Sequence, residues 1–286
     1  MGGSFVSSQA EAAPAPIPVS AARAQKDAIA DATRGRGDGD VQFAYRVAAA
    51  LNAEDVVNKA DYNFFWMTAV TADGQIVLAN SYGLAYLPEA VTLPAQANMA
   101  SADDTIAVEQ RARWATYPNL ALQGWAAHHD TTLRVVIAKE EHFKGIDPGA
   151  PRKLIADEDI PASGKMQGRS RLEVVAPADA ARLALASDLG LVEMVPPAPV
   201  DVSPPADQRN TLWFEVWKHL MSSDADRGTG HLRAFVTYAA HAQELALHRA
   251  HTAVHAVEQR ASVADWMYWQ RIAALLDRAL DGSVHP

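Results

Sequence analysis

The spacing of hydrophobic residues changes several times along the chain. From Val41 to Leu51, apolar residues recur every three or four positions, which predicts a helix. The same spacing returns over residues 103–115 and 119–129, and Pro177 stands at the first position of a further helix over 177–187. The first half of the chain is therefore predicted to contain several short helices.

Runs of aromatic and β-branched residues predict strands between these helices. Residues 64–71 and 75–80 flank the pair Asp73-Gly74, a strong signal for a tight antiparallel hairpin because glycine accepts the positive φ of such turns. The segments "LRVVIA" (133–138) and "RLEVV" (171–175) are predicted as further strands. Residues 41–195 are thus expected to form an α+β domain with an antiparallel sheet and helices.

A proline-rich segment separates this domain from the C-terminal part of the chain. The stretch "VPPAPVDVSPPADQ" from Val195 to Gln208 contains five prolines, which favour an extended spacer, so residues 196–208 are predicted as a linker. Residues 209–286 have helical spacing interrupted at 222–230 and near 258–262, which predicts a hairpin or bundle of three helices. Residues 1–40 are predicted as a partly disordered Ala/Pro-rich linker that begins with a tag remnant, "MGGSFVSSQ", so the chain is expected to be a fragment.

Composition narrows the class of protein. The 25 basic and 34 acidic side chains give a net charge of −9, which argues against a nucleic-acid partner. The absence of cysteine excludes thiolate chemistry and cysteine-based zinc sites. No apolar run approaches the roughly 18 residues of a membrane span, and the first residues lack the pattern of a signal peptide. We therefore expect a cytoplasmic protein without a membrane span.

Histidines are concentrated in "HAQELALHRAHTAVH", which holds four of the ten in the chain. On one continuous helix, His241, His248, His251, His255 and Glu244 would fall within about 80° of one another, opposite an apolar stripe. The stripe would be about 21 Å long, so one ion could not bind both of its ends. We expect no metal or cofactor there, and predict that this face packs on the other domain or on a partner protein.

Sequence signatures of catalysis are weak. No GxSxG or HExxH motif is present. The adjacent acids Asp103 and Asp104 are more typical of solvated or capping positions, and in His128-His129-Asp130 neighbouring side chains would point apart. The chain is therefore predicted not to be an enzyme, with a metal-binding or hydrolytic domain built on the histidine stripe as the alternative.

The spacing of the tryptophans is more informative about packing and partner binding. The spacing of Trp213 and Trp217, and of Trp266 and Trp269, places each pair on one face of a helix. Core packing is the ordinary interpretation, while exposed members would anchor a protein partner.

Two long segments carry a family resemblance. Through "WMTAVTADGQIVLANSYGLAYLP" and "GHLRAFVTYAAHAQELALHRAHTAVH" with "ADWMYWQRIAALL", the chain from about residue 40 onward resembles the C-terminal region of the EspK family of mycobacterial type VII (ESX-1) secretion-associated proteins. The resemblance implies a chaperone or adaptor that binds a secreted, EspB-like substrate in the cytoplasm and helps present it to the secretion machinery. It allows a secretion ATPase as a second partner, and it implies no catalytic residues.

The resemblance and the residues together suggest where a partner would bind. We predict that the binding surface includes Tyr82, Tyr86, Trp213 and Trp217 together with the His241, His248, His251 and His255 face, since such side chains tolerate both burial and solvent. The chain lacks a WxG turn and a tyrosine-based YxxxD or YxxxE signal, so export of the chain itself is the less favoured alternative.

Overall fold

The computed structural model describes residues 38–57, 61–198, 203–222, 224 and 226–282. The chain divides into two compact units, Met1–Gly39 and Asp40–Pro286. The predicted linker and tag remnant over residues 1–40 lie outside the described residues as far as residue 37. The predicted boundaries at 196 and 208 fall inside the second unit, and independent folding of residues 41–195 and 209–286 stays a prediction.

The fold is α+β, as predicted, around a five-stranded mixed sheet of order β3-β2-β1-β4-β5. Its centre is the predicted hairpin: β1 (Trp66–Thr71) pairs antiparallel with β2 (Ile76–Asn80), and Gly74 in the turn has a φ of 87°. Strand β4 (Leu133–Ala138) is antiparallel to β1. The edge strands β3 (Ala97–Met99) and β5 (Arg152–Leu154) pair in parallel with β2 and β4, so only the central pairs have the predicted antiparallel direction.

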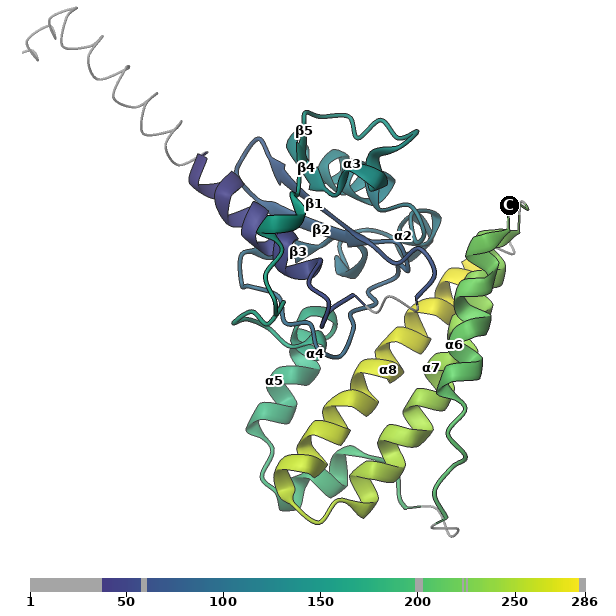
Figure 1. Ribbon diagram of the computed structural model, residues 1–286. Coiled ribbons are helices and arrows are strands. Elements are labelled where there is room, and N and C mark those ends of the chain that lie inside the picture. The colour runs from purple at the N-terminus through teal and green to yellow at the C-terminus, as the bar shows by residue number, and fades with distance from the viewer. Residues whose placement is uncertain (1–37, 58–60, 199–202, 223, 225, 283–286) are drawn as a thin grey trace, which may run out of the picture. The chain divides into compact units, whose positions relative to one another are not determined.

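Both faces of the sheet are covered. Trp66 and Val70 of β1 join the hydrophobic cluster that contains buried residues of the helical segment 40–51, whereas Met67 and Ala69 join the cluster that contains buried residues of α3 (Pro118–His128). Figure 1 shows the helical residues 40–51 beside the sheet. The alternation of side chains along a strand therefore serves two cores.

Helices α2 (Val108–Arg113), α4 (Arg171–Val175) and α5 (Pro177–Leu185) connect the sheet to the C-terminal region or lie beside it. Helix α2 is shorter than its predicted range, and α5 begins at its predicted proline. The prediction of a strand at 171–175 is wrong, because these residues form α4. Ser170 and Glu173 form a capping box there, each side chain bonding the other's backbone N–H, and this local motif outweighs the β-branched composition.

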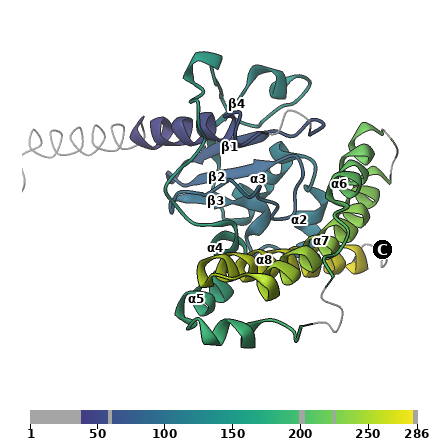
Figure 2. The ribbon, with the colours of Figure 1, turned by 60° about the horizontal axis from the view of Figure 1, so that its bottom comes forward.

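The C-terminal region contains the three predicted helices: α6 (Arg209–Lys218), α7 (Arg227–Thr252) and α8 (Ala256–Gly282). A 3-10 helix, η5 (His219–Met221), continues α6, and η4 (Leu189–Met194) precedes the proline-rich segment. Helices α7 and α8 lie side by side in both ribbon views (Figure 1, Figure 2). None of the described helices combines the length and apolar character needed to cross a bilayer.

Small residues allow α7 and α8 to approach closely. Ala239, Ala242, Ala246 and Ala250 are buried along α7, spaced by three or four residues. The predicted break near 258–262 is wrong, since α8 continues through these residues and the turn falls at 253–255. The side chains of Trp266 and Trp269 are buried, which confirms core packing for that pair.

The loop after β2 joins the sheet to these helices through an unusual backbone. Gly83, Leu84 and Ala85 have φ values of 61°, 32° and 62°, a left-handed run that costs about 1–2 kcal/mol per non-glycine residue. The Asn80 Oδ1 accepts hydrogen bonds from the backbone N–H groups of Tyr82 and Gly83 at 3.1 and 3.0 Å. The Ser101 hydroxyl accepts one from Ala85 at 2.9 Å. These contacts hold the loop in place.

Tyr268 of α8 ties the same loop to the helical hairpin. Its side chain is fully buried, and its hydroxyl accepts a hydrogen bond from the backbone N–H of Leu87 at 2.8 Å. The Arg171 guanidinium lies 4.6 Å from the centre of the Tyr268 ring and donates to Asp265 at 2.6 Å. A hydroxyl, a ring face and an ion pair thus connect α4 and α8 to the loop.

Replacing Tyr268 by phenylalanine tests this junction. The substitution leaves the Leu87 N–H buried without its acceptor, so the free energy of unfolding should fall by about 1–3 kcal/mol in urea denaturation. Tyr117→Phe, at a tyrosine that is 44% exposed, is the matched control and should change it by less than about 0.5 kcal/mol. Equal stability of the two variants would show that the Tyr268 hydroxyl does not support the fold.

His142 makes stability depend on pH. Its ring stacks on Phe65 with centroids 4.2 Å apart, and burial lowers its pKa to about 4 although Glu141 lies 3.8 Å away. As the pH falls below about 6.5, His142 binds a proton in the unfolded chain but stays neutral in the folded chain until the pH approaches 4. The stabilising contribution of the neutral ring is therefore complete above pH 6.5 and declines as the pH falls toward 4.

His142→Phe keeps the stacking and removes the titration. Between pH 7 and pH 4.5, the free energy of unfolding should fall by about 1–2 kcal/mol less in the variant than in wild type. The effect is modest because the wild-type ring is 15% exposed and keeps part of its solvation. Urea denaturation at both pH values measures this. His255→Gln, at an exposed histidine, should retain the wild-type pH dependence; if His142→Phe also retains it, His142 is not the group responsible.

Candidate partner-binding site

Three of the predicted partner-binding residues meet in an aromatic cluster. The rings of Tyr82 and Tyr86, from the loop after β2, lie 5.5 and 5.3 Å from that of Trp213 in α6. Phe235 of α7 lies 5.4 Å from Tyr86. Tyr82 is fully buried and Tyr86 is 9% exposed, so this cluster is part of the core of the free chain. Partner binding through Tyr82, Tyr86 and Trp213 stays a prediction.

His231 lies against this cluster inside the core. Its ring is fully buried between two backbone carbonyl groups, with Nδ1 2.9 Å from the Val216 oxygen and Nε2 3.1 Å from the Tyr82 oxygen. Burial lowers the pKa of His231, although the contacts with the Val216 and Tyr82 carbonyl groups oppose this shift. One imidazole therefore joins α6, α7 and the loop after β2.

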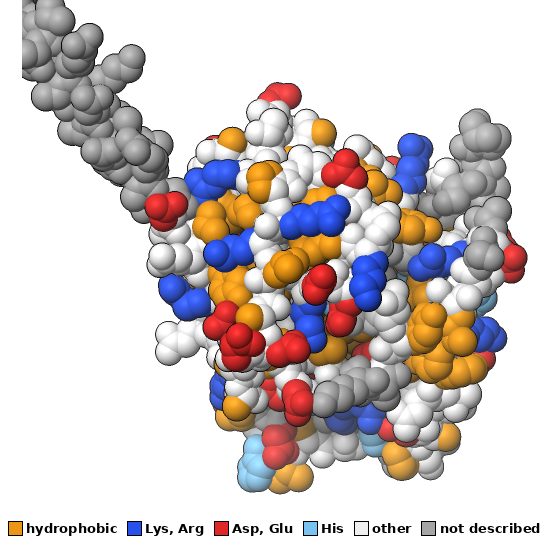
Figure 3. Space-filling view, turned by 45° about the horizontal axis from the view of Figure 1, so that its top comes forward, with side chains coloured by type: hydrophobic (Ala, Val, Ile, Leu, Met, Phe, Trp, Pro, Cys, Tyr) orange, Lys and Arg blue, Asp and Glu red, His pale blue; other side chains and the backbone are white. Residues whose placement is uncertain are grey.

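The fourth predicted aromatic residue, Trp217, lies in a patch that reaches the surface. It stacks on Tyr62 with centroids 5.8 Å apart and an angle of 21°, and Phe214 meets it edge-on at 4.7 Å. Tyr62 is 42% and Phe214 46% exposed. Tyr62, Phe214 and Trp217 form the aromatic patch. Figure 3 shows a group of hydrophobic side chains on the side of the molecule where α6 lies and further hydrophobic side chains near the centre of that face, with Lys and Arg between them.

The histidine face differs from its prediction in two respects. Helix α7 ends at Thr252, so His255 lies in the turn before α8 and not on the same helix. The apolar stripe predicted opposite the histidines is only partly found: its alanines in α7 are buried, but Val254 and Val257, which were included in it, are 87% and 80% exposed. Helix α7 thus buries its small residues, whereas the exposed valines follow it, Val254 in the turn and Val257 at the start of α8.

Two of the histidines hold the proline-rich segment. The Nε2 of His241 accepts a hydrogen bond from the backbone N–H of Gln208 at 3.0 Å, which places the ring proton on Nδ1, 3.4 Å from a Glu244 oxygen. The Nε2 of His251 lies 3.1 Å from the Pro196 carbonyl oxygen. His248 is half-buried and His255 is exposed. The described ends of the proline-rich segment therefore lie against the histidine face of α7.

These positions do not form a metal site. Within the part of the chain that the structure describes, no three His, Asp or Glu side chains are grouped closely enough to hold an ion. His241 and His251 are separated by ten residues of α7, and one ring nitrogen of each already contacts the backbone.

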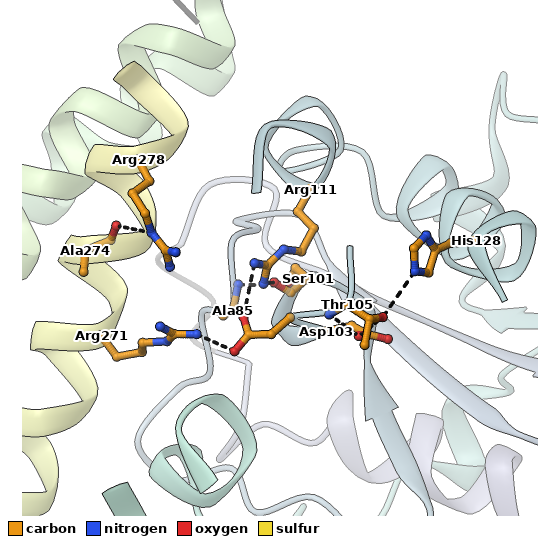
Figure 4. A network of polar contacts seen from close by, with 10 residues as sticks. Ala85, Ser101, Asp103, Thr105, Arg111, His128, Arg271, Ala274 and Arg278 are labelled. Carbon is orange, nitrogen blue, oxygen red and sulfur yellow. Dashed lines mark hydrogen bonds and ion pairs between the residues drawn. The ribbon is translucent and has the colours of Figure 1, made fainter. Parts of the chain in front are cut away.

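The adjacent acids Asp103 and Asp104 belong to a network of polar contacts (Figure 4). Asp104 accepts hydrogen bonds from Arg111 of α2 and Arg271 of α8, which links the two helices. Asp103 accepts from Trp125 Nε1 at 2.8 Å and contacts His129 Nε2 at 2.8 Å. Although burial opposes it, these bonds and those from Thr105 lower the pKa of Asp103.

This network contains a hydroxyl, a histidine and a carboxylate, the residue types of a nucleophilic site, but the hydroxyl donates to the carboxylate and not to the histidine. The Thr105 hydroxyl donates to the Asp103 carboxylate at 2.6 Å, so the His128 Nε2, 3.2 Å away, faces its lone pairs and not its proton. His128 in this arrangement cannot take the proton from Thr105. The contacts connect the loop at 103–105 with α3.

A polar pocket adjoins the aromatic cluster. The pocket measures about 170 Å³ and is enclosed by residues from α4, α6, α7, α8 and the loop after β2. We call it the arginine pocket, and its lining is Tyr86, Glu89, Arg171, Arg209, Tyr238, Ala242, Leu245, Arg249 and Trp269. A shallower groove of about 470 Å³ continues from it toward the α7–α8 turn, and Glu89 and Arg249 line both.

Apart from Tyr86 and Trp269, these pocket residues are absent from the sequence predictions. The three arginines stand at 171, 209 and 249, in segments with no shared motif, and only the packing of α4, α6 and α7 brings them together. Tyr62 was missed for the same reason, since 155 residues separate it from Trp217. A spacing rule applied within one helix cannot find such groups.

Comparison with known proteins gives the chain a context. Residues 54–281 match the family described as the EspK C-terminal domain. Over 240 residues the chain is 57% identical to the ESX-1 secretion-associated protein EspK of Mycobacterium tuberculosis (strain CDC 1551 / Oshkosh), covering 84% of this chain and 33% of that protein. An uncharacterised protein of Mycolicibacterium smegmatis (strain MKD8) is 50% identical over 240 residues, which is 84% of this chain and 32% of that protein. The chain thus spans about a third of the length of these relatives.

Hydrogen exchange tests the contact between His241 and the proline-rich segment. In His241→Leu the Gln208 N–H loses its acceptor, so this amide should exchange about five- to tenfold faster, as expected for the loss of one hydrogen bond. His248→Leu, on the same helix, changes a ring that makes no hydrogen bond to the described residues and should leave the rate at Gln208 unchanged. Equal rates at Gln208 in wild type and His241→Leu would contradict the contact.

Proposed function

Because the chain belongs to the EspK C-terminal domain family, we propose that it is a chaperone or adaptor domain of a type VII secretion system. In this proposal it binds a secreted, EspB-like substrate in the cytoplasm and helps present it to the secretion machinery, with a secretion ATPase as a second contact. It acts by binding and not by catalysis. The family relation carries the proposal, and the surface of α6 supplies the site.

The aromatic patch is the surface that best fits a protein partner. Large aromatic side chains contribute most of the binding energy at many protein interfaces, because they bury much area and lose little conformational entropy. Trp217 is held between Tyr62 and Phe214, so it is already ordered before a partner arrives. Met221, seven residues after Phe214 and 60% exposed, extends the apolar surface along η5.

The alternative of a metal-dependent or hydrolytic domain has no comparable support. It requires histidines of α7 that are free to bind an ion, whereas His241 and His251 contact the ends of the proline-rich segment. The described residues offer surface for a protein and no convergent set of metal ligands.

Calorimetry with a purified EspB-like substrate tests the proposal. Wild type should bind it, and Phe214→Ala should weaken binding about tenfold or more, as expected for a residue at the centre of an interface. Leu185→Ala removes a side chain that is 89% exposed on α5 and is the control, expected to bind like wild type. Absence of heat at high micromolar concentration would reject the proposed substrate, and equal loss in both variants would reject the aromatic patch as its site.

A further inference from the structure

The arginine pocket contains more hydrogen-bond donors than its own acceptors satisfy. Arg171 and Arg249 each donate from one nitrogen to Asp265, at 2.6 and 3.2 Å. Arg209 donates from two nitrogens to Asp207, at 3.0 and 2.6 Å. A guanidinium carries five N–H donors, so each of these arginines retains donors without an acceptor among the described residues.

Two tyrosine hydroxyls increase this excess. The hydroxyls of Tyr86 and Tyr238 have no hydrogen-bond partner in the described part of the chain, and Tyr86 is only 9% exposed. Burial raises the pKa of both groups, so they keep their protons and act as donors. A ligand in the pocket with an acceptor oxygen would give these hydroxyls a hydrogen-bond partner.

The acidic residues around the pocket limit the charge of such a ligand. Asp265 and Asp207 already neutralise part of the guanidinium charge. Glu89 also lines the pocket, but its side chain is exposed and can turn toward solvent. A singly charged anion therefore suits the pocket better than a doubly charged phosphate.

We infer that the arginine pocket binds a carboxylate group. A planar carboxylate accepts two parallel hydrogen bonds from a guanidinium, and the flat ring of Trp269 gives one wall of the pocket a matching shape. The adjoining groove that shares Glu89 and Arg249 provides room for the rest of the ligand. The carboxylate belongs either to a polypeptide, at its chain terminus or on an acidic side chain, or to a small organic acid. The inference does not depend on the identity of the secreted substrate.

Nuclear magnetic resonance of the arginine side chains tests the pocket directly. N-acetylglycine is titrated into the chain while the Nε–Hε signals of Arg171, Arg209 and Arg249 are followed, with each signal assigned by an Arg→Gln variant. N-acetylglycinamide, which lacks the charge, and inorganic phosphate are titrated in parallel. A hexapeptide of alanine and glycine is then tested with a free and with an amidated C-terminus.

Saturable shifts with N-acetylglycine and not with its amide are expected. Arg249→Gln should weaken binding about tenfold, whereas Glu89→Gln should strengthen it about three- to tenfold, because one removes a charged donor and the other a competing carboxylate. Tyr238→Phe should weaken it about threefold or more. Arg278→Gln, at an exposed arginine of α8 outside the pocket, is the control and should bind like wild type.

The other outcomes overturn the inference. These are the absence of saturable shifts, equal shifts with the amide, tighter binding of phosphate than of N-acetylglycine, or unchanged affinity in Arg249→Gln. If the free-terminus hexapeptide binds tighter than N-acetylglycine, the natural ligand is a chain terminus; if it does not, it is an acidic side chain or a small acid. Failure here while Phe214→Ala still weakens substrate binding would reject the carboxylate site and leave the proposed function standing.

Discussion

The structure depends on how α8 is fixed to the loop after β2. The Tyr268 hydroxyl bonds the backbone of Leu87 inside the core, where water cannot replace it. Arg171 lies over the same ring and forms an ion pair with Asp265. The Asp265 carboxylate also accepts a hydrogen bond from Arg249 of α7. Because each of these polar groups contacts a partner from another element, neither the loop nor the hairpin can move without breaking several contacts.

This junction also creates the candidate sites. The left-handed run from Gly83 to Ala85 turns the chain so that Tyr82 and Tyr86 both face the helices, and His231 bonds that turn to α6. Helix α6 is thereby placed with Trp213 inward and Phe214 outward. The aromatic patch and the arginine pocket thus both result from the packing of α6 against the loop and the other helices. The patch is exposed at the surface, whereas the pocket is lined with hydrogen-bond donors.

The histidine face shows how a surface motif can serve the chain itself. His241 and His251 contact the backbone near the two ends of the proline-rich segment, whose prolines cannot donate backbone hydrogen bonds. The segment is therefore held to α7 by side chains of the helix. The density of histidines in this stretch has a structural use in the free chain, and their part in binding a partner remains a prediction.

Elements with a local cause could be predicted from the amino-acid order alone. Asp73-Gly74 specified the hairpin, Pro177 the start of α5, and residues 209–282 their three helices, because turn and helix signals act over a few residues. The capping box at Ser170 was an equally local signal, although the β-branched residues after it favoured a strand. Long-range packing, in contrast, settled which aromatics are buried, that the histidines meet Pro196 and Gln208, and that three arginines share a pocket. Such contacts join residues far apart in the chain, and no periodicity within a single element encodes them.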